Sequence, residues 1–313
     1  ALRLMSSSKI EFAPHITLTN SDFRFIVSEQ LQAVGIDPGP ILIEPEAKNT
    51  APAILTASLY AESKGPDAIL LAAPSDHIIP DFEEFHEAVK VGLDQVQDGK
   101  MVTFGISPTH SETGYGYLEL AIENLDSSAA SSVVKFVEKP EKSRAEQMLA
   151  AGNYLWNAGL FLFSAVDMIA AFEEFAPESL KLAKKAIRTA KPDLGFLRLN
   201  PKPWANLEDI SIDYAIMEKA KNLVAVPFSS KWSDLGGWDS VWSESSKDTA
   251  GNATTIGTHA IDCSDTLLRS ESAGQQIVGL GLKSVIVIAM PDAVLVAQKD
   301  KAQNVKQVVD HLS

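Results

Sequence analysis

Cysteine is almost absent from this sequence, which has only Cys263 among its 313 residues. A single thiol allows no disulfide within the chain, so the sequence is not that of a cross-linked secreted scaffold. Histidine is also sparse, and its six residues form no close pair of the kind found in zinc sites. These absences favour a cytoplasmic protein.

Basic residues are outnumbered, because 27 Lys and Arg face 41 Asp and Glu and the formal net charge is −14. A nucleic-acid backbone needs a basic surface, so nucleic acid is excluded as the partner. No apolar run approaches the roughly 18 to 20 residues of a membrane span, which argues against a membrane partner. An acidic protein still binds phosphorylated small molecules where a metal ion and a few Lys residues reverse the local field.

Hydrophobic residues make up 45% of the chain, enough for the core of one large domain or two smaller ones. Short apolar runs alternate with segments of helical spacing, which predicts an α/β fold with a parallel or mixed sheet and right-handed crossovers. The predicted strands are 16–19, 41–43, 68–73, 102–105, 133–137, 156–163 and 223–226, and the predicted helices are 22–34, 50–60, 82–96, 165–175, 177–190 and one that begins at 211.

The stretch from Ala68 to Pro80 is the first candidate site. Its apolar run is of strand length and predicts a strand buried on both faces of the sheet. Asp76 and His77 follow directly, where open α/β sheets bind ligands at the carboxyl ends of their strands. A turn or helix cap is the competing interpretation of Asp76, although Asp81 supplies a separate start for the next helix.

Other polar residues follow the same logic of strand ends and helix starts. Thr50 with Pro52 behind it begins a helix whose free N–H groups suit an anionic or acceptor-rich ligand, although an ordinary capped loop explains it equally. Glu138 and Lys139 end a predicted strand. Two Gly residues flank Tyr115 and allow close backbone approach to a ligand, a pattern that plain hairpins share. Asp234 lies between two Trp residues, where pairing with a cation is expected.

A polar segment from Ser243 to Thr255 marks a boundary, which predicts domains of residues 1–245 and 246–313. Beyond it, short strands recur near 254–259, 266–269, 276–278, 284–289 and 293–297, and a helix begins near Asp300. The second domain is therefore predicted to be a small β-rich module with a terminal helix.

Seven segments, in order, resemble bacterial mannose-1-phosphate guanylyltransferases, the nucleotidyltransferases that make GDP-mannose. They are EPEAKNTAPA (44–53), APSDH (73–77), TGYGY (113–117), FVEKP (136–140), WNAGLFLF (156–163), SIDYAIME (211–218) and WSDLGGWDSVW (232–242), and MPDAVLVA (290–297) adds an eighth. The resemblance implies a Rossmann-like, mixed and mostly parallel sheet with helices on both faces, followed by a left-handed β-helix-like domain.

The resemblance also implies roles for individual residues. Asp76 and Asp234 would hold Mg²⁺, and Lys139 would complete the catalytic group. The guanine side would be lined by Asn49, Thr50, Ala51 and Pro52; mannose and its phosphate would be held by Gly114, Tyr115, Glu138, Lys139 and Asn157; Ser75 and His77 would flank the nucleotide sugar. The implied partners are GTP, mannose 1-phosphate and GDP-mannose.

The sequence departs from the family pattern in three places. Lys48 stands where many relatives have Arg. The planar guanidinium with its several hydrogen-bond donors is thus replaced by a compact ammonium group. Residues 1–20 lack the Gly-rich loop that wraps the triphosphate, so we expect residues missing before Ala1 and no activation of GTP by a chain that begins there. The sequence as given stops at Ser313 without the isomerase barrel of bifunctional relatives, so we expect no isomerase activity from these 313 residues.

The implied reaction is in-line attack of a mannose 1-phosphate oxygen on the α-phosphorus of GTP, which needs positioning and charge neutralisation rather than a protein nucleophile. Two alternatives stay open: uridylyl or thymidylyl transfer to glucose 1-phosphate, and a non-catalytic nucleotide-sugar-binding subunit. The resemblance further implies a homodimer, and the apolar segment Val285–Met290 suits either a dimer contact or the module's own core.

Overall fold

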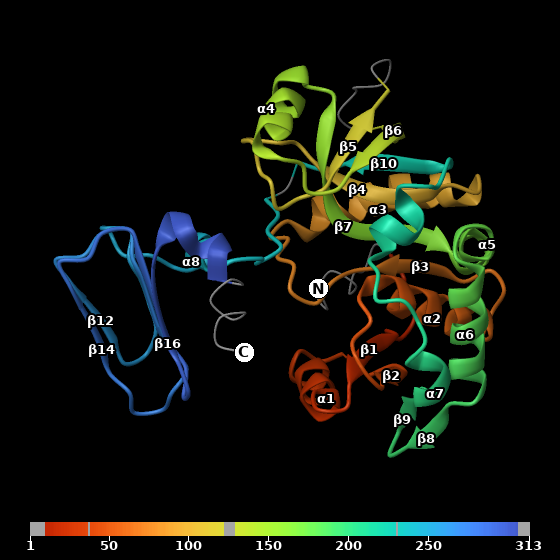
Figure 1. Cartoon of the computed structure of the whole chain (residues 1–313), viewed down its shortest axis with the longest axis horizontal. Helices are drawn as coiled ribbons and strands as arrows, with labels where there is room; N and C mark the ends of the chain where they lie inside the picture. Colours follow the sequence, from red (N-terminus) through yellow and green to blue (C-terminus); the bar gives the residue numbers. More distant parts are fainter. Residues whose placement is uncertain (1–9, 37, 122–128, 230, 306–313) are drawn as a thin grey trace. The chain divides into compact units, whose positions relative to one another are not determined.

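The computed structural model describes residues 10–36, 38–121, 129–229 and 231–305, apart from the side chains of residues 303 and 304 (Figure 1). The chain divides into two compact units. Unit 1 consists of Ala1–Ser75 and Ile79–Trp232, and unit 2 of Asp76–Ile78 and Ser233–Ser313. None of the helices in the described ranges combines the length and apolar character that a bilayer crossing requires.

Unit 1 contains a six-stranded sheet with the strand order β3-β7-β4-β10-β6-β5. Its strands are β3 (Ile69–Ala72), β4 (Met101–Ile106), β5 (Tyr117–Leu120), β6 (Ser131–Val137), β7 (Tyr154–Ser164) and β10 (Leu223–Pro227). The neighbours β4 and β10 are parallel, whereas β7 is antiparallel to β3, β4 and β5. β6 is antiparallel to β5 and β10. The mixed sheet is thus confirmed, but its neighbouring strands are mainly antiparallel, because β6 and β7 run against the others.

Helices cover both faces of this sheet, as predicted (Figure 1). Alternate side chains of β10 point to opposite faces, so Leu223 and Ala225 join one hydrophobic cluster and Val224 and Val226 the other. The first cluster is completed by α2 (Thr50–Glu62), α5 (Ala165–Phe175), α6 (Pro177–Arg188) and the π-helix η3 (Asp213–Met217). The second is completed by α3 (Phe82–Gln97) and α4 (Lys142–Ala151).

The strand that precedes Asp76 is not buried on both faces, and that prediction is wrong. β3 lies at the end of the strand order, with β7 as its neighbour, and Ile69 is 42% exposed. The predicted helix start at Asp81 is confirmed, because its side chain accepts a 3.0 Å hydrogen bond from the N–H of Glu84. Asp76 is therefore not the cap of α3.

A smaller four-stranded sheet in unit 1 has the order β1-β2-β9-β8. It joins the two early strands β1 (Thr17–Asn20) and β2 (Ile41–Glu44) to the later hairpin of β8 (Lys191–Asp193) and β9 (Phe196–Arg198). The helices beside these strands in the chain are α1 (Arg24–Ala33) and α7 (Pro201–Trp204). The early strands thus belong to a sheet separate from that of β3 and β4.

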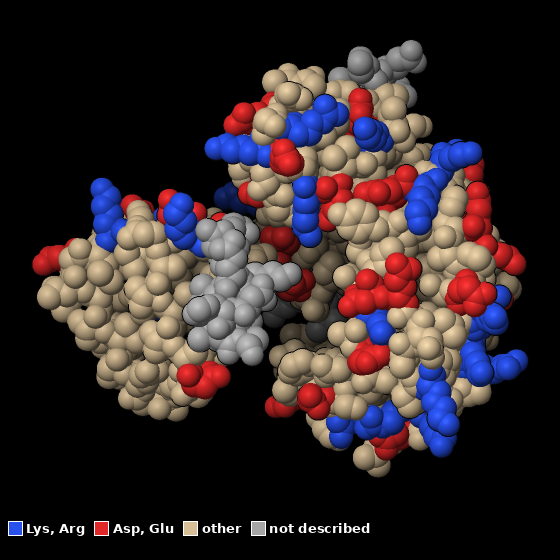
Figure 2. Space-filling view, in the orientation of Figure 1, with Lys and Arg blue, Asp and Glu red and all other residues tan. Residues whose placement is uncertain are grey.

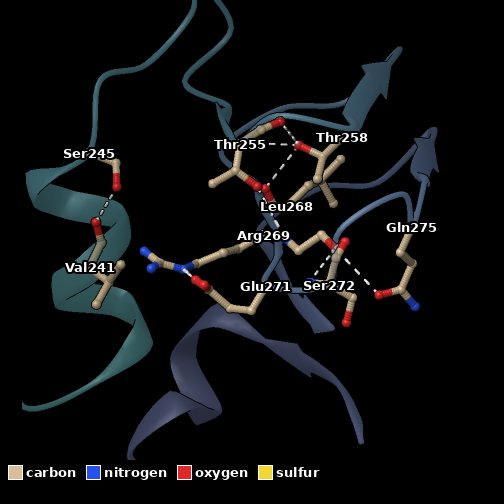
Figure 3. Close-up of polar contacts among 10 residues, drawn as sticks. Val241, Ser245, Thr255, Thr258, Leu268, Arg269, Glu271, Ser272 and Gln275 are labelled. Carbon is tan, nitrogen blue, oxygen red and sulfur yellow. Dashed lines mark hydrogen bonds and ion pairs between the residues drawn. The ribbon is translucent and has the colours of Figure 1, made fainter. Parts of the chain in front are cut away.

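Unit 2 is built from stacked strands. The strands β11 (Ala253–Thr254), β13 (Leu267–Ser270) and β15 (Val285–Ala289) pair in parallel, as do β12 (Thr258–Ile261) and β14 (Ile277–Leu280). The Thr258 hydroxyl donates to the carbonyls of Thr255 and Leu268 at 2.9 and 3.1 Å, which links successive coils (Figure 3). This arrangement agrees with the predicted β-helix, whose handedness stays a prediction.

The last elements of unit 2 cover one side of this stack. β16 (Val294–Gln298) pairs antiparallel to β15, and the 3-10 helix η4 (Lys299–Asn304) follows. The side chains of α8 (Trp238–Glu244) pack on the same cluster as Leu267 and Ile286. The second unit therefore includes α8, which the boundary at 245/246 assigned to the first domain. Residues 306–313 of the predicted terminal helix lie outside the described residues.

Candidate active site

A pocket of about 410 Å³ opens in unit 1. Three segments meet there: the turn before α2, the residues that follow β6, and the segment that enters η3. The lining residues are Asn49, Thr50, Glu138, Lys139, Asp209, Ile210, Ser211, Asp213 and Tyr214. Asn49, Thr50, Glu138 and Lys139 were predicted from separate parts of the sequence, and the structure brings them together in this pocket.

Asn49 adopts φ 61° and ψ −168°, a backbone conformation that non-glycine residues rarely occupy. Its side chain accepts a 2.9 Å hydrogen bond from the N–H of Thr50 and so begins α2. The Thr50 hydroxyl in turn accepts from the N–H of Ile212 at 2.9 Å, and the N–H of Ala51 donates to Ile210 at 3.1 Å. These bonds fix the start of α2 against the segment that enters η3.

Ala51 and Pro52 are buried within α2, so their side chains do not line the pocket. Lys48 is also directed elsewhere. Its ammonium lies 3.2 Å from Glu46 and donates to the carbonyl of Ala205 at 3.3 Å. Of the segment 48–52, Asn49 and Thr50 therefore reach the pocket.

Glu138 is packed tightly against the Gly-Tyr-Gly loop. A Cβ on Gly116 would lie 2.6 Å from Oε2 of Glu138 and 3.2 Å from the ring of Phe136, so a side chain at this position would displace the Glu138 carboxylate. Lys139 has φ 45°, a second left-handed residue in the pocket lining, and its ammonium is 3.4 Å from the Glu138 carboxylate. Strain of this kind is retained where the surrounding structure demands one backbone path, and it is common at ligand sites.

Asn157 lies in β7 and is 9% exposed. Its side-chain oxygen accepts from the Thr103 hydroxyl at 2.8 Å and from the N–H of Gly159 at 3.2 Å. Its side-chain nitrogen donates to Asp213 at 3.1 Å, and its backbone N–H donates to Gly116 at 2.8 Å. Asn157 therefore ties the centre of the sheet to two walls of the pocket.

Asp213 is the first residue of η3 and lies in the helix that was predicted to begin at residue 211. Burial, and then the neighbouring Glu138 carboxylate, raise its pKa to about 6, although hydrogen bonds from Ser211 and Asn157 act in the opposite direction. A π-helical turn and a perturbed carboxyl are both frequent at functional sites. Asp213 is thus a pocket residue that was missed because it does not follow a predicted strand.

The other missed lining residues, Asp209, Ile210, Ser211 and Tyr214, share the same segment. It follows no strand of the main sheet, so it had no strand-end signal. The available signal was SIDYAIME, which carried the resemblance but received no roles. Its hydrogen bonds to Thr50 and Ala51 form only in the folded chain.

The two predicted metal ligands both belong to unit 2. Ile78 and Ser233 form an antiparallel bridge, with N–H···O distances of 2.8 and 3.1 Å, which places Asp76 and Asp234 on adjoining segments. Both carboxylates act on His77 between them. Burial lowers the pKa of His77, and the charges of Asp76 and Asp234 counteract that shift.

Asp234 is held by a tight turn. Its Oδ1 accepts a 3.0 Å hydrogen bond from the N–H of Gly236, and Leu235 between them has φ 48°. A Cβ on Gly236 would lie 2.8 Å from Oδ2 of Asp234. Across the described residues, no group of three or more His, Cys, Asp or Glu side chains is arranged to hold a metal ion, and the pair of Asp76 and Asp234 stays a predicted metal site.

Three further predicted residues lie away from the pocket lining. Ser75 is exposed directly before Asp76. The N–H of Gly114 donates to the Glu112 carboxylate at 2.8 Å. The ring of Tyr115 makes edge-on contacts with Trp156 and Trp232, at centroid distances of 5.4 and 5.0 Å. Tyr115 is therefore braced by other aromatic rings.

Comparison with known proteins identifies the family of this chain. The profile of the nucleotidyl transferase family matches residues 4–251. The chain belongs to this family. Residues 259–312 match a second profile, the mannose-phosphate isomerase/GMP-like β-helix domain, which agrees with the stacked strands of unit 2.

Individual proteins are similar to almost the whole chain. The xanthan biosynthesis protein XanB of Xanthomonas campestris pv. campestris is 40% identical over 310 residues, which are 99% of this chain and 64% of XanB. The mannose-1-phosphate guanylyltransferase RfbM of Salmonella typhimurium is 38% identical over 299 residues, 95% of this chain and 62% of RfbM. This chain therefore spans less than two thirds of the length of these relatives.

A solved structure is also similar. The crystal structure of a mannose-1-phosphate geranyltransferase from Thermus thermophilus superposes with a TM-score of 0.78 at 30% identity, over 95% of this chain and 83% of that one. The similarity covers both the nucleotidyl transferase region and the β-helix. The predicted fold class is confirmed.

Proposed function

We propose that this nucleotidyl transferase converts GTP and mannose 1-phosphate into GDP-mannose and pyrophosphate. The observation that carries the proposal is the pocket that joins Asn49 and Thr50 to Glu138 and Lys139 in a chain 38% identical to a mannose-1-phosphate guanylyltransferase. In the reaction, a phosphate oxygen of mannose 1-phosphate forms a bond to the α-phosphorus of GTP. The bond from that phosphorus to the oxygen bridging it to the β-phosphorus breaks, and pyrophosphate leaves.

The charges of the pocket suit a sugar. Glu138, Asp209 and Asp213 offer carboxylate oxygens, which accept hydrogen bonds from hydroxyl groups. Lys139 is the cation among the described lining residues; its side chain is 63% exposed, and its ammonium lies 3.4 Å from the Glu138 carboxylate. We assign the carboxylates to the hexose hydroxyls and Lys139 to the sugar phosphate.

Asn49 and Thr50 begin α2, and the positive end of the helix dipole favours acceptor atoms and negative charge there. We assign the nucleotide to this end of the pocket. The backbone bonds to Ile210 and Ile212 hold the turn in place before the ligand arrives. Such preorganisation reduces the entropy lost on binding.

Asp76 and Asp234 fit Mg²⁺, which takes oxygen ligands and is commonly held by one or two carboxylates together with substrate phosphates. When bound, the cation supplies charge neutralisation for the phosphates of both substrates. The bridge between Ile78 and Ser233 fixes the two segments, and the turn at Leu235 orients the second carboxylate.

We also propose that the protein is a homodimer that acts in the cytoplasm, where GTP is available. Unit 2 exposes Val278, Leu280 and Val296 to 60%, 69% and 66%, more apolar surface than a small β-helix needs to leave uncovered. Figure 2 shows that the visible face of this unit carries few charges. Sedimentation equilibrium of the purified protein tests the dimer, and a monomer at micromolar concentration contradicts it.

Pyrophosphate release tests the reaction. The full-length gene product with Mg²⁺ is given each of four nucleoside triphosphates with mannose 1-phosphate or glucose 1-phosphate, because a chain that begins at Ala1 is not expected to activate GTP. Release with GTP and mannose 1-phosphate above all other pairs supports the proposal, and preference for UTP or dTTP with glucose 1-phosphate identifies the alternative transferase. Thermal stabilisation by GDP-mannose without turnover of any pair identifies a nucleotide-sugar-binding subunit instead.

A further inference from the structure

Asp213 stands apart from the other carboxylates of the pocket because it is held from the interior of the sheet. Its Oδ1 accepts from the side chain of Asn157, whose own oxygen is taken up by the fully buried hydroxyl of Thr103 and the N–H of Gly159. Asn157 therefore cannot rotate without breaking two further bonds. The chain Thr103–Asn157–Asp213 fixes the direction of the Asp213 carboxyl at the pocket wall.

Without a ligand, the two neighbouring carboxyl groups are held in an energetically unfavourable arrangement. Asp213 and Glu138 are neighbouring carboxyl groups in one half-buried pocket, and their mutual repulsion together with burial disfavours the ionised form of Asp213. Lys139 lies beside Glu138, at 3.4 Å. Hydroxyl donors from a ligand would satisfy the remaining acceptor sites of Asp213, whereas an anionic group would add repulsion.

We propose that Asp213 is a binding residue of this pocket that accepts a hydrogen bond from a hydroxyl group of the hexose, and that Asn157 is its positioning residue. The proposal rests on the proposed function and deepens it, because it names a contact that selects the sugar. A capping role at the start of η3 does not explain why Asp213 bonds to Asn157. The Ser211 hydroxyl already caps this helix, because it accepts a hydrogen bond from the N–H of Tyr214 at 3.4 Å.

Calorimetric titration with GDP-mannose and with GDP tests the proposal. For Asp213→Ala we expect binding of GDP-mannose to weaken by about tenfold or more, as for the loss of a hydrogen bond to a charged group, while binding of GDP changes less than about twofold. Asp213→Asn keeps an acceptor for Asn157 and should fold where the Ala variant does not; it should weaken GDP-mannose binding selectively as well. The control is Asp94→Asn, an exposed carboxylate on α3, which should bind both ligands normally.

A second titration uses mannose 1-phosphate and its analogues that each lack one hydroxyl. Wild-type protein should bind one analogue more weakly than mannose 1-phosphate, whereas Asp213→Ala should bind that analogue and mannose 1-phosphate equally well. The hydroxyl missing from that analogue is then the one that contacts Asp213. Thr103→Val should reduce the same discrimination in part, because it frees Asn157 to turn.

The outcomes separate the two proposals. If wild-type protein binds GDP and GDP-mannose but both Asp213 variants bind GDP-mannose normally, the role of Asp213 is refuted and the proposed function stands. Equal loss of both ligands with a lower unfolding temperature shows a structural role and also refutes it. If wild-type protein binds neither ligand, the proposed function falls together with this inference.

Discussion

Gly116 and Glu138 face each other so closely that a Cβ on the glycine would lie 2.6 Å from the carboxylate oxygen Oε2. The contact joins the Gly-Tyr-Gly loop to the end of β6. It means that the position of a predicted sugar-binding carboxylate depends on a residue with no side chain of its own.

Substitution of Gly116 by Ala should therefore displace Glu138 and raise the KM for mannose 1-phosphate about tenfold, with a smaller change for GTP. The control is Gly65→Ala, where no atom lies within 4 Å of the added Cβ. Steady-state kinetics of pyrophosphate release check both variants. Equal effects at the two positions would mean that contact with Glu138 does not control the KM.

Replacement of Lys139 by Met should raise the KM for mannose 1-phosphate and lower kcat, because the cation assigned to the sugar phosphate is lost. A charge-assisted contact of this type corresponds to roughly 1.5 to 3 kcal/mol, or about tenfold to a hundredfold in kcat/KM. Lys135→Met, an exposed Lys on β6, the strand that precedes Lys139, is the control. An unchanged kcat/KM in Lys139→Met would show that Lys139 does not bind the sugar phosphate.

Asp76→Asn and Asp234→Asn should each lower turnover by about a hundredfold and increase the Mg²⁺ concentration needed for half-maximal rate. The double variant should be little worse than either single one, since the two residues would hold the same ion. Asp67→Asn is an exposed control upstream of β3. Addition of EDTA to wild-type protein should abolish pyrophosphate release, and turnover that survives chelation would contradict the metal role.

Stability should depend on pH through Glu44 at the end of β2. Burial raises the pKa of Glu44 from about 4.5 to about 7, and among the described residues its Oε1 is a buried oxygen with no hydrogen-bond partner. The native state therefore retains a proton that the unfolded chain loses above pH 4.5. Its contribution to stability is full below that pH and is lost as pH rises towards 7.

Glu44→Gln should remove this part of the pH dependence. We expect the variant to be more stable than wild type at pH 8 by on the order of 2 kcal/mol and nearly equal to it at pH 4.5. Urea unfolding at both pH values measures the difference, with the exposed Glu29→Gln as the control. A difference that is the same at the two pH values would rule out titration of Glu44 as the cause.

Local patterns in the sequence indicated part of the pocket. The helix start at Thr50 and the strand end at Glu138 and Lys139 are properties of neighbouring residues, and these residues line the pocket, whereas Asn49 was expected only from the family resemblance. Asp209 and Asp213 were missed because their place in the pocket depends on backbone bonds from Ile210 and Ile212 to α2, more than 150 residues earlier in the chain.

The fold shows the same division between local and distant causes. Helices such as α3 were predicted from their own spacing and caps, and the cap at Asp81 is confirmed. The burial of β3 was not predictable, because an apolar run does not reveal whether its strand will lie inside a sheet or at its edge. The short strands β8 and β9 carry little apolar signal and depend on pairing with β2.

The tripeptide Asp76–Ile78 belongs to unit 2 through its bridge to Ser233, although it lies far from that unit in the sequence. Whether the carboxylate pair is inherited together therefore depends on where an exchange of gene segments falls. A recombination event between the two family profiles, after residue 251, would pass on Asp76 and Asp234 together. A crossover at the junction of the compact units, after Trp232, would bring the two carboxylates from different parent genes.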